Sequence, residues 1–234
     1  MSVRPHSETH NPEAGQFFML QTGKTYDPLL KRPFSLFRCQ NGILQFLYRM
    51  RGKGTMCMAD VKAGEVVQIL GPLGNAYPVP AGDFIVVSGG IGIASTFSLL
   101  QKYPNKAYLF YGARNCDELL MLDEAKALAK DVCITTDDGT VGKKGLITGP
   151  LKEHMESAVF AKKPLPIYTC GPTPMLKAIA QILKGRGLTC YASLEEVMAC
   201  GLGACLGCVT KTISGYKRVC KEGPVFDIED IVWE

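Results

Sequence analysis

Four cysteines near the end of the chain restrict its fold more than any other feature of the sequence. Three follow the spacing C-x4-C-x2-C and the fourth comes after eleven further residues: Cys200, Cys205, Cys208 and Cys220. This is the plant-type spacing of thiolates that hold a [2Fe–2S] cluster. Glycines lie between the ligands, where a Cβ would crowd the cluster and where positive φ is accessible: Gly201, Gly203 and Gly207. The pattern predicts a short cluster-binding segment.

Two other uses of cysteine fit the sequence less well. A structural zinc site typically shows two C-x2-C pairs, and only one is present here. Disulfides would indicate an exported protein, and the N-terminus does not read as a signal peptide. Ten cysteines without an export signal predict a reducing compartment, the cytoplasm. Most cysteines outside the cluster motif are expected to be small buried hydrophobes.

The composition is that of an ordinary globular protein and argues against some classes of function. Hydrophobic residues make up 47% of the chain and charged residues 21%. The net charge of +4 is mild and the Lys and Arg residues are scattered, so we expect no nucleic-acid partner. No apolar run reaches the length of a membrane span, so we expect no membrane insertion.

The N-terminal third reads as short strands separated by turns. Strands are expected at residues 16–21, 34–39, 43–49 and 65–70. Asn41-Gly42 stands between two of them and is a strong signal for a two-residue hairpin. Several short strands at this spacing predict a small antiparallel β-barrel, which we place at residues 1–79.

The pattern changes to alternating strands and helices near residue 80. Residues 84–88 form a continuous apolar run, as expected for a strand buried on both faces of a parallel sheet. Further strands are expected at 107–111, 132–136, 166–170 and 188–192, with helices between them. The alternation predicts an α/β domain with a parallel sheet at residues 80–194, followed by the small cluster domain at 195–234.

Two turns in the α/β region lie where open sheets of this kind bind ligands. In the first, Gly90 and Gly92 precede a helix, so a pyrophosphate could approach the backbone and the helix N-terminus. This turn does not fit G-x-G-x-x-G, and close packing explains such glycines equally well. The second is Cys170-Gly171-Pro172, whose alternative is a plain turn with an incidental thiol. Two such strand ends in one sheet favour a nucleotide cleft.

A third candidate site lies in the predicted barrel. Arg32-Pro33-Phe34-Ser35 combines an arginine that can clamp a phosphate with a hydroxyl that can bond a ring nitrogen. Leu47-Tyr48-Arg49 follows, and Gly54-Thr55 stands where a short helix could offer N–H groups to another phosphate. Without context these are a surface arginine, a core phenylalanine and a loop. Beside a cluster and a nucleotide domain they suggest a flavin.

The motifs, taken in their order, resemble a known family. Arg-Pro-Phe-Ser, Gly-x-Gly-Thr, Gly-Gly-x-Gly, Tyr-Gly-Ala-Arg at 111–114, Cys-Gly-Pro and the cysteine spacing are similar to the ferredoxin–NADP reductase superfamily. Within it, residues 15–234 most resemble the electron-transfer subunits of NAD-dependent (class 1B) dihydroorotate dehydrogenase. The family usually has more residues before the strand that starts near Gly15. Residues 1–10 are therefore expected either to supply a short strand or to leave the barrel open at that edge.

The resemblance implies a role for each matching residue. FAD would be held by Arg32 at the pyrophosphate, by Ser35 near the isoalloxazine, and by Pro33, Phe34, Leu47, Tyr48, Arg49, Gly54 and Thr55. Gly90 and Gly92 would face NAD. Cys170 would lie near the nicotinamide–flavin contact and, with Ser35, would be a catalytic position. The cluster ligands would be Cys200, Cys205, Cys208 and Cys220.

The resemblance also implies an oxidoreductase subunit that acts in pyrimidine biosynthesis. Electrons would pass, through FAD and the [2Fe–2S] cluster, between NAD and an FMN-containing catalytic subunit that oxidises dihydroorotate. The complex would be a heterotetramer with two copies of each chain. Asp117 and Glu118 favour NAD over NADP because carboxylates repel a 2′-phosphate, whereas Arg114 would accept one.

Two alternatives remain open at this point. Reductase subunits of sulfhydrogenases or of ferredoxin-dependent transhydrogenases are similar over most of these motifs. A redox sensor, in which the cluster reports oxidant or iron status, belongs to a different class and needs no flavin or nicotinamide site. Bleaching of a bound flavin by NADH would separate a reductase from such a sensor.

Overall fold

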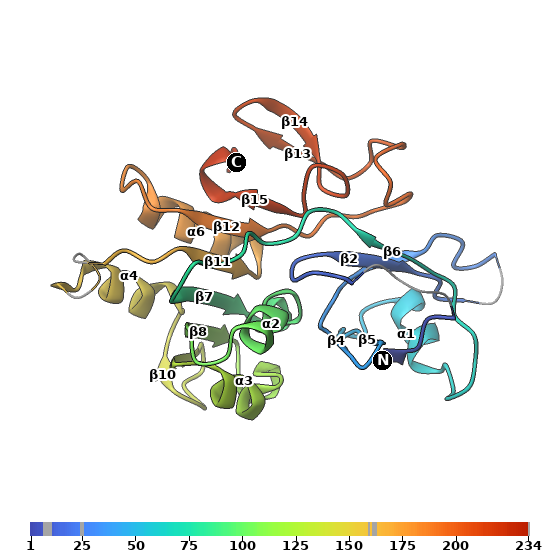
Figure 1. Ribbon diagram of the computed structural model, residues 1–234, viewed down its shortest axis with the longest axis horizontal. Coiled ribbons are helices and arrows are strands. Elements are labelled where there is room, and N and C mark those ends of the chain that lie inside the picture. The colour runs from blue at the N-terminus through green and yellow to red at the C-terminus, as the bar shows by residue number, and fades with distance from the viewer. Residues whose placement is uncertain (7–10, 24–25, 159, 161–162, 234) are drawn as a thin grey trace.

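The computed structural model describes residues 1–6, 11–23, 26–158, 160 and 163–233. Its strands form two small antiparallel sheets from the N-terminal third, one large sheet, and a two-stranded hairpin near the C-terminus. Figure 1 shows the two small sheets beside the large sheet, with the hairpin on a separate lobe. None of the described helices is long and apolar enough to span a lipid bilayer.

The N-terminal third contains two three-stranded sheets, with strand orders β1-β5-β4 and β3-β2-β6. Their strands are β1 (Ser2–Val3), β2 (Phe17–Leu20), β3 (Arg32–Ser35), β4 (Arg38–Gln40), β5 (Ile43–Gln45) and β6 (Ile69–Leu73). The strand expected at 34–39 is divided between the two sheets. Because β1 pairs with β5, residues near the start of the chain do supply a short strand. The described pairings give two open sheets and not one closed barrel.

Asn41 and Gly42 form the turn between β4 and β5, as their sequence predicts. Both residues have positive φ, 52° and 72° respectively, as a two-residue type I′ turn requires. The two small sheets share one apolar core, in which Phe18 of β2 packs against Phe46 with ring centroids 5.5 Å apart. The short helix α1 (Lys53–Ala59) lies between β5 and β6 in the chain and begins one residue before Gly54, where the sequence suggests a short helix.

The large sheet has the strand order β10-β9-β8-β7-β11-β12-β15. These strands are β7 (Phe84–Gly89), β8 (Ala107–Ala113), β9 (Asp131–Thr136), β10 (Lys143–Lys144), β11 (Ile167–Cys170), β12 (Cys190–Ser193) and β15 (Val225–Asp227). All neighbours pair in parallel except β15, which is antiparallel to β12. The predicted parallel strands are thus present, and two edge strands, β10 and β15, were not foreseen.

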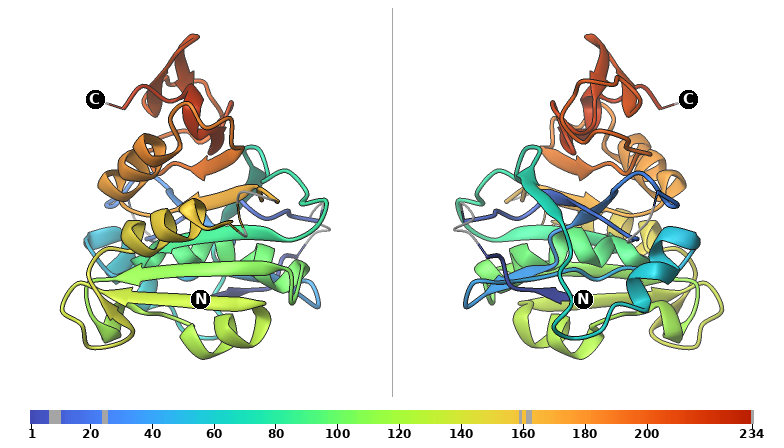
Figure 2. Two further views of the ribbon diagram at one scale, coloured as in Figure 1. Left: turned by 90° about the vertical axis from the view of Figure 1, so that its left-hand side faces the viewer. Right: turned by 90° about the vertical axis from the view of Figure 1, so that its right-hand side faces the viewer.

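Helices cover both faces of this sheet because the side chains of its central strand alternate between them. Val86 packs with residues of α2 (Ile93–Lys102) and α3 (Leu122–Leu128), whereas Val87 packs with residues of α4 (Thr148–Glu156) and α6 (Thr173–Leu183). Figure 2 shows these helices on the two sides of the layered strands. Three short 3-10 turns, η1 (Gly90–Gly92), η2 (Cys116–Glu118) and η3 (Ile228–Asp230), complete the described elements.

The C-terminal segment forms a lobe at one end of the molecule, drawn in red in Figures 1 and 2. It contains an irregular loop through the cysteine motif and the hairpin β13 (Val209–Thr212) and β14 (Gly215–Arg218). The chain then returns to the large sheet as β15. Trp233 packs against that sheet's core and donates from Nε1 to the Ile228 carbonyl, 3.2 Å away, so it belongs to the local core.

The expectation for the cysteines outside the motif is only partly right. Cys170 and Cys190 are buried, but Cys39 and Cys116 are exposed. Cys39 lies in the three-residue strand β4 and Cys116 at the start of η2. Their immediate neighbours in the sequence are polar: Arg38 and Gln40 beside Cys39, and Asn115 and Asp117 beside Cys116.

Candidate functional site

Two cavities are lined by predicted site residues, and the larger of the two, about 970 Å³, lies where the small sheets meet the large one. Its volume is at the upper end of the usual range for ligand pockets. The Arg-Pro-Phe-Ser box of β3 forms one wall, and residues after β5 form a second. The lining includes Arg32, Pro33, Phe34, Ser35, Leu47, Tyr48 and Arg49, all of which the sequence singled out. The structure therefore brings these separate motifs to one cavity.

Aromatic and cationic side chains give this cavity its chemical character. Phe34 and Tyr48 meet edge to face, with ring centroids 5.5 Å apart, and form an apolar wall. Arg32 and Arg51 add positive charge on the same lining. An aromatic wall beside arginines suits a ligand that joins a planar ring system to phosphates, as FAD does.

A second cavity, about 480 Å³, lies at the carboxyl ends of the parallel strands. Its lining comes from the glycine turn after β7, the ends of β8 and β9, and the turn after β11, and it includes Gly90, Gly92, Thr135, Asp137 and Gly171. This is the edge at which open α/β sheets bind nucleotides. The glycine turn predicted to face a dinucleotide is therefore part of a cavity.

Close packing also explains one of these glycines. A Cβ on Gly92 would lie 2.2 Å from the backbone oxygen of Cys170, so no other residue fits there without moving a strand end. Gly90 has a φ of +50°, and its nearest neighbour would be the Glu118 carboxylate at 3.7 Å. Close packing thus accounts for Gly92, while both glycines also line the smaller cavity.

The two cavities share a wall. Both are lined by Arg49, Arg51, Ile91, Arg114 and Glu195. Arg49, from the small-sheet side, pairs with Glu118 of η2 at 3.3 Å. Because the wall is common, two ligands that occupy the cavities lie next to each other, which is the arrangement that hydride transfer between two cofactors needs.

Three of the residues predicted to bind ligand are absent from both linings. Thr55 uses its hydroxyl within the turn, where it accepts from the backbone N–H groups of Arg51 and Gly52 at 2.9 and 3.1 Å. A Cβ on Gly54 would meet Thr22 Oγ1 at 3.1 Å and Arg32 Nε at 3.3 Å, so this glycine lets α1 approach a cavity residue.

Cys170 is the third residue outside the linings. Its side chain is fully buried, and burial raises the pKa of its thiol well above the usual range. It lies close to Glu195, Ser95 and Ser193. Since Ser95 and Glu195 line the larger cavity, the thiol stands one layer behind the cavity wall.

Glu195 was not predicted as a site residue, although it lines both cavities. The residue as a whole is exposed, but its carboxyl group lies among protein atoms that desolvate it, and this desolvation raises the pKa of the carboxyl group. Thr135 and Asp137 were also missed. The rule that pointed to the ends of β7 and β11 applies equally to β9 and β12, and applying it there would have found all three.

The four motif cysteines are arranged as two pairs. Cys205 and Leu202 donate backbone N–H groups to Cys200 Sγ at 3.5 and 3.4 Å, and these bonds lower the pKa of the Cys200 thiol to about 6. Burial, together with the adjacent Cys208 thiol, raises the pKa of Cys220 to about 12. Among the described residues, no three His, Cys, Asp or Glu side chains converge as a single metal ion would require. A [2Fe–2S] cluster is held by four thiolates, and the two pairs supply that number.

An apolar core connects the second pair of cysteines to the larger cavity. Cys208 and Cys220 are buried together with Phe17 and Met198 in one cluster of packed side chains. Phe17 and Met198 also line the larger cavity. The second cysteine pair and the larger cavity therefore share one layer of packed apolar side chains.

Comparison with protein families supports these assignments. Residues 195–232 match the iron-sulfur cluster binding domain of dihydroorotate dehydrogenase B, and residues 86–181 match the oxidoreductase NAD-binding domain. The first match contains the four motif cysteines, and the second contains most of the parallel strands beside the smaller cavity.

Individual proteins are similar over nearly the whole chain. The dihydroorotate dehydrogenase B (NAD(+)) electron transfer subunit of Caldanaerobacter subterraneus subsp. tengcongensis is 38% identical, with 95% of this chain and 88% of that protein covered. The electron transfer subunit homolog of Aquifex aeolicus is 37% identical, with 94% and 86% covered.

Solved structures show the same architecture. The structure of an NADH-dependent reduced ferredoxin-NADP oxidoreductase, described for flavin-based electron bifurcation, has a TM-score of 0.83 at 25% identity, with 95% of this chain and 80% of that chain covered. The ferredoxin-NADP+ reductase of Plasmodium falciparum has a TM-score of 0.61 at 16% identity, with 79% and 88% covered, and indicates the fold alone.

Proposed function

Because this chain belongs to the family of electron transfer subunits of dihydroorotate dehydrogenase B, we propose that it carries electrons between NAD and a catalytic partner subunit that oxidises dihydroorotate. It is an oxidoreductase subunit with the ferredoxin–NADP reductase type of fold, and its cofactors are FAD, NAD and a [2Fe–2S] cluster. When bound, FAD exchanges a hydride with nicotinamide and single electrons with the cluster.

The residues of the larger cavity are proposed to hold FAD. Arg32 supplies positive charge for the pyrophosphate, Phe34 and Tyr48 pack against the ring system, and Ser35 can hydrogen-bond a ring nitrogen. Gly54 supports this site from behind by letting α1 approach Arg32, and Thr55 holds the turn that precedes α1. The two small sheets are proposed to act as one barrel, because Phe18 and Phe46 pack across them.

The smaller cavity is proposed to hold NAD. Gly90 and Gly92 leave space at the glycine turn, and Asp137 and Glu118 contribute negative charge to the lining. Carboxylates repel an additional 2′-phosphate, which favours NAD over NADP. Asp137 carries more of this preference than Asp117, which does not line the cavity. Cys170, from behind the wall, fixes the strand end on which Gly92 packs.

The observation that carries the proposal is the apolar layer between the cysteine pairs and the FAD cavity. Cys200 and Cys205 are proposed to ligate one iron and Cys208 and Cys220 the other. The second pair shares its core with Phe17 and Met198, which line the cavity. Because these side chains touch both the second cysteine pair and the cavity, they provide a route for electron transfer through the protein interior.

The partner is proposed to be the FMN-containing catalytic subunit, in a complex with two copies of each chain. The cluster lobe offers a suitable surface, because several large apolar side chains around the cysteine loop and hairpin are exposed: Val197, Leu202, Leu206, Ile213 and Tyr216. Exposed apolar side chains gathered on one lobe are typical of a docking surface. A reducing, cytoplasmic location is also proposed, because the four motif cysteines must remain thiolates in order to ligate the cluster.

We also propose three functional units at residues 1–79, 80–194 and 195–234. The pairing changes from small antiparallel sheets to the parallel sheet between β6 and β7, in support of the first boundary. The second boundary separates the nucleotide-binding unit from the cluster-binding unit by function. It does not separate them as folding units, since β15 of the C-terminal segment belongs to the large sheet.

The test is anaerobic reconstitution. This chain is mixed with a purified class 1B catalytic subunit, dihydroorotate and NAD, and NADH formation is followed at 340 nm while each component is omitted in turn. Turnover that requires both chains is the expected result. Turnover that proceeds equally well without this chain would contradict the proposal.

A second candidate function follows from the structural likeness to the NADH-dependent reduced ferredoxin-NADP oxidoreductase. In that case the chain would be the reductase subunit of a transhydrogenase or a sulfhydrogenase. Reduction of the bound flavin and cluster by NADH, without dihydroorotate turnover, would favour this candidate. The higher identity to the dihydroorotate dehydrogenase subunits favours the first.

A further inference from the structure

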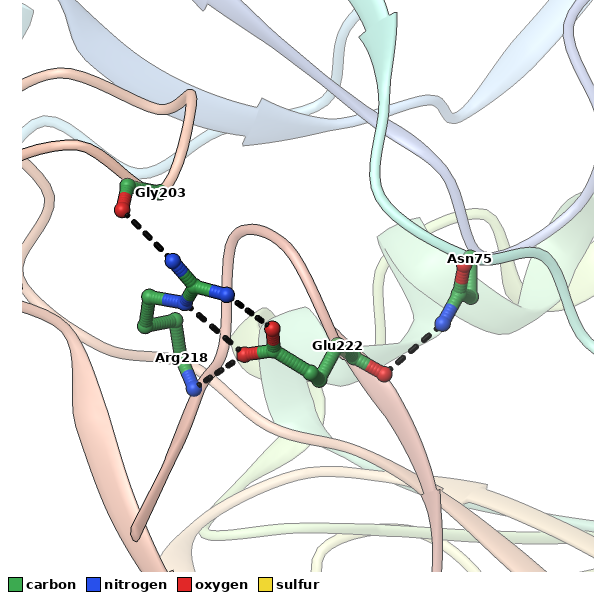
Figure 3. Close-up of polar contacts among 4 residues, drawn as sticks. All are labelled: Asn75, Gly203, Arg218 and Glu222. Atoms are coloured by element: carbon green, nitrogen blue, oxygen red, sulfur yellow. Dashed lines mark hydrogen bonds and ion pairs between the residues drawn. The ribbon is translucent and has the colours of Figure 1, made fainter.

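A guanidinium connects the two halves of the cysteine motif, as Figure 3 shows. Arg218 Nη1 donates to the Gly203 carbonyl at 2.9 Å, and Gly203 lies in the loop between Cys200 and Cys205. On its other side, Arg218 pairs with Glu222, donating from Nε to Oε2 at 3.1 Å and from Nη2 to Oε1.

Arg218 precedes Cys220 in the sequence and Glu222 follows it, so the contacts between them enclose Cys220. Glu222 Oε2 also accepts from the Arg218 backbone N–H at 2.7 Å, which closes the turn around Cys220. Its backbone carbonyl accepts from Asn75 Nδ2 at 2.7 Å, and the Asn75 backbone N–H donates to the Gly223 carbonyl at 2.6 Å. Asn75 follows β6, so the chain of contacts ends on the small-sheet side of the molecule (Figure 3).

These contacts differ from an ordinary surface ion pair, which contributes little. The carboxylate is bound at both oxygens by the planar guanidinium, and both side chains are about two-thirds covered, with 34% and 31% exposed. The guanidinium also interacts electrostatically with the thiols of Cys220 and Cys208. A fixed positive charge is thus held beside the second cysteine pair.

We propose that Arg218 is a positioning residue for the [2Fe–2S] cluster. Its side chain closes the cysteine loop through the bond to Gly203, and its positive charge raises the reduction potential of the cluster. The proposal rests on the four cysteines being the cluster ligands, and it does not depend on the identity of the partner subunit. Reduction adds an electron to an already anionic cluster, so a nearby cation stabilises the reduced form and a nearby anion destabilises it.

The opposite charges of the pair give a test that a merely structural role would not pass. R218Q removes the cation and is expected to reduce the equilibrium constant for reduction of the cluster about tenfold. For a one-electron couple, this lowers the reduction potential by about 59 mV. E222Q removes the anion and is expected to shift the potential in the opposite direction. If the substitutions only loosened the loop, the reduction potentials of both variants would shift in the same direction.

The measurement is an anaerobic redox titration of the cluster-loaded, full-length chain, followed by the EPR signal of the reduced cluster. K221Q is the matched control, because Lys221 is exposed, lies next to Cys220 and loses the same charge. Its effect is expected to be much smaller, since solvent and salt screen an exposed charge. Shifts of the same sign in R218Q and E222Q, or equal shifts in R218Q and K221Q, would overturn the proposal.

R218K tests loop closure separately from charge. Lysine keeps the positive charge but lacks the fork that binds Gly203 and Glu222 together. Iron loss to a chelator is expected to be several-fold faster in R218K than in the unsubstituted protein, and equal rates would overturn the closure role. If R218Q retains no cluster, an unshifted potential in E222Q overturns the charge role. An unsubstituted protein that forms no cluster would instead contradict the ligand assignment itself.

Discussion

Gly201 of the cysteine loop lies against the side chain of Met19 in β2. A Cβ at Gly201 would stand 2.6 Å from Met19 Cγ, and the glycine has a φ of +70°. The cluster loop is therefore seated directly on the sheet whose neighbouring strand carries the Arg-Pro-Phe-Ser box.

Replacing this glycine is expected to destabilise the protein. In G201A, the clash with Met19 and the left-handed backbone together cost about 2–4 kcal/mol of the free energy of unfolding. Urea unfolding and the iron content of the purified protein measure the effect. G82A is the control, because nothing lies within 4 Å of a Cβ at Gly82 and its φ is ordinary. Equal stability of the two variants would contradict the close packing of loop and sheet.

Met198 is expected to matter for both stability and electron transfer. It is only 6% exposed and packs between the second cysteine pair and the larger cavity. M198A removes this packing, which typically costs about 2–5 kcal/mol. Rapid-mixing spectroscopy after NADH addition is expected to show slower reduction of the cluster relative to the flavin. V66A provides the comparison, since Val66 is 76% exposed and lies outside both cavity linings. An unchanged cluster reduction rate in M198A would argue against this route.

Asp137 is expected to set the preference for NAD. Its carboxylate lines the smaller cavity, so D137S removes negative charge that repels a 2′-phosphate. The ratio of kcat/KM for NADPH over NADH is expected to rise about tenfold, or about 1.4 kcal/mol. D117S changes a carboxylate outside the lining and is expected to leave the ratio unchanged. A larger effect at Asp117 would reverse the assignment and support the expectation from the sequence.

Glu195 is expected to make stability depend on pH. Desolvation raises its pKa in the folded protein above 4.5, so the folded state favours the protonated carboxyl. The contribution of Glu195 to the free energy of unfolding is therefore fully favourable below pH 4.5, and it is lost as the pH rises through the raised pKa. E195Q cannot ionise and is expected to gain stability relative to the unsubstituted protein across that interval, while the two converge at low pH. Urea unfolding at a series of pH values measures the difference, and parallel curves would contradict the prediction.

Local motifs identified residues that the fold brings to the two cavities, because each motif combines its side chains within a few residues. The Arg-Pro-Phe-Ser box, the residues after β5 and the glycine turn all line cavities, and the Asn41-Gly42 turn has the predicted conformation. The strand expected at 34–39 failed because its two halves join different sheets, which no local pattern encodes.

The residues that the sequence missed depend on contacts between distant parts of the chain. Glu195 becomes a site residue only because β12 ends beside the two cavities. β15 is three residues long, and it is a strand only because β12 offers an open edge. Short edge strands carry little pattern of their own, so their pairing must be seen in three dimensions.

The return of the chain as β15 determines how the cluster can work. The lobe leaves the large sheet after β12 and re-enters it beside the same strand, with Ala192 opposite Phe226. A segment anchored at both ends on one strand pair cannot swing as a tethered carrier between a loading position and a delivery position. The speed of electron exchange with a catalytic partner is therefore expected to depend on how the two subunits dock.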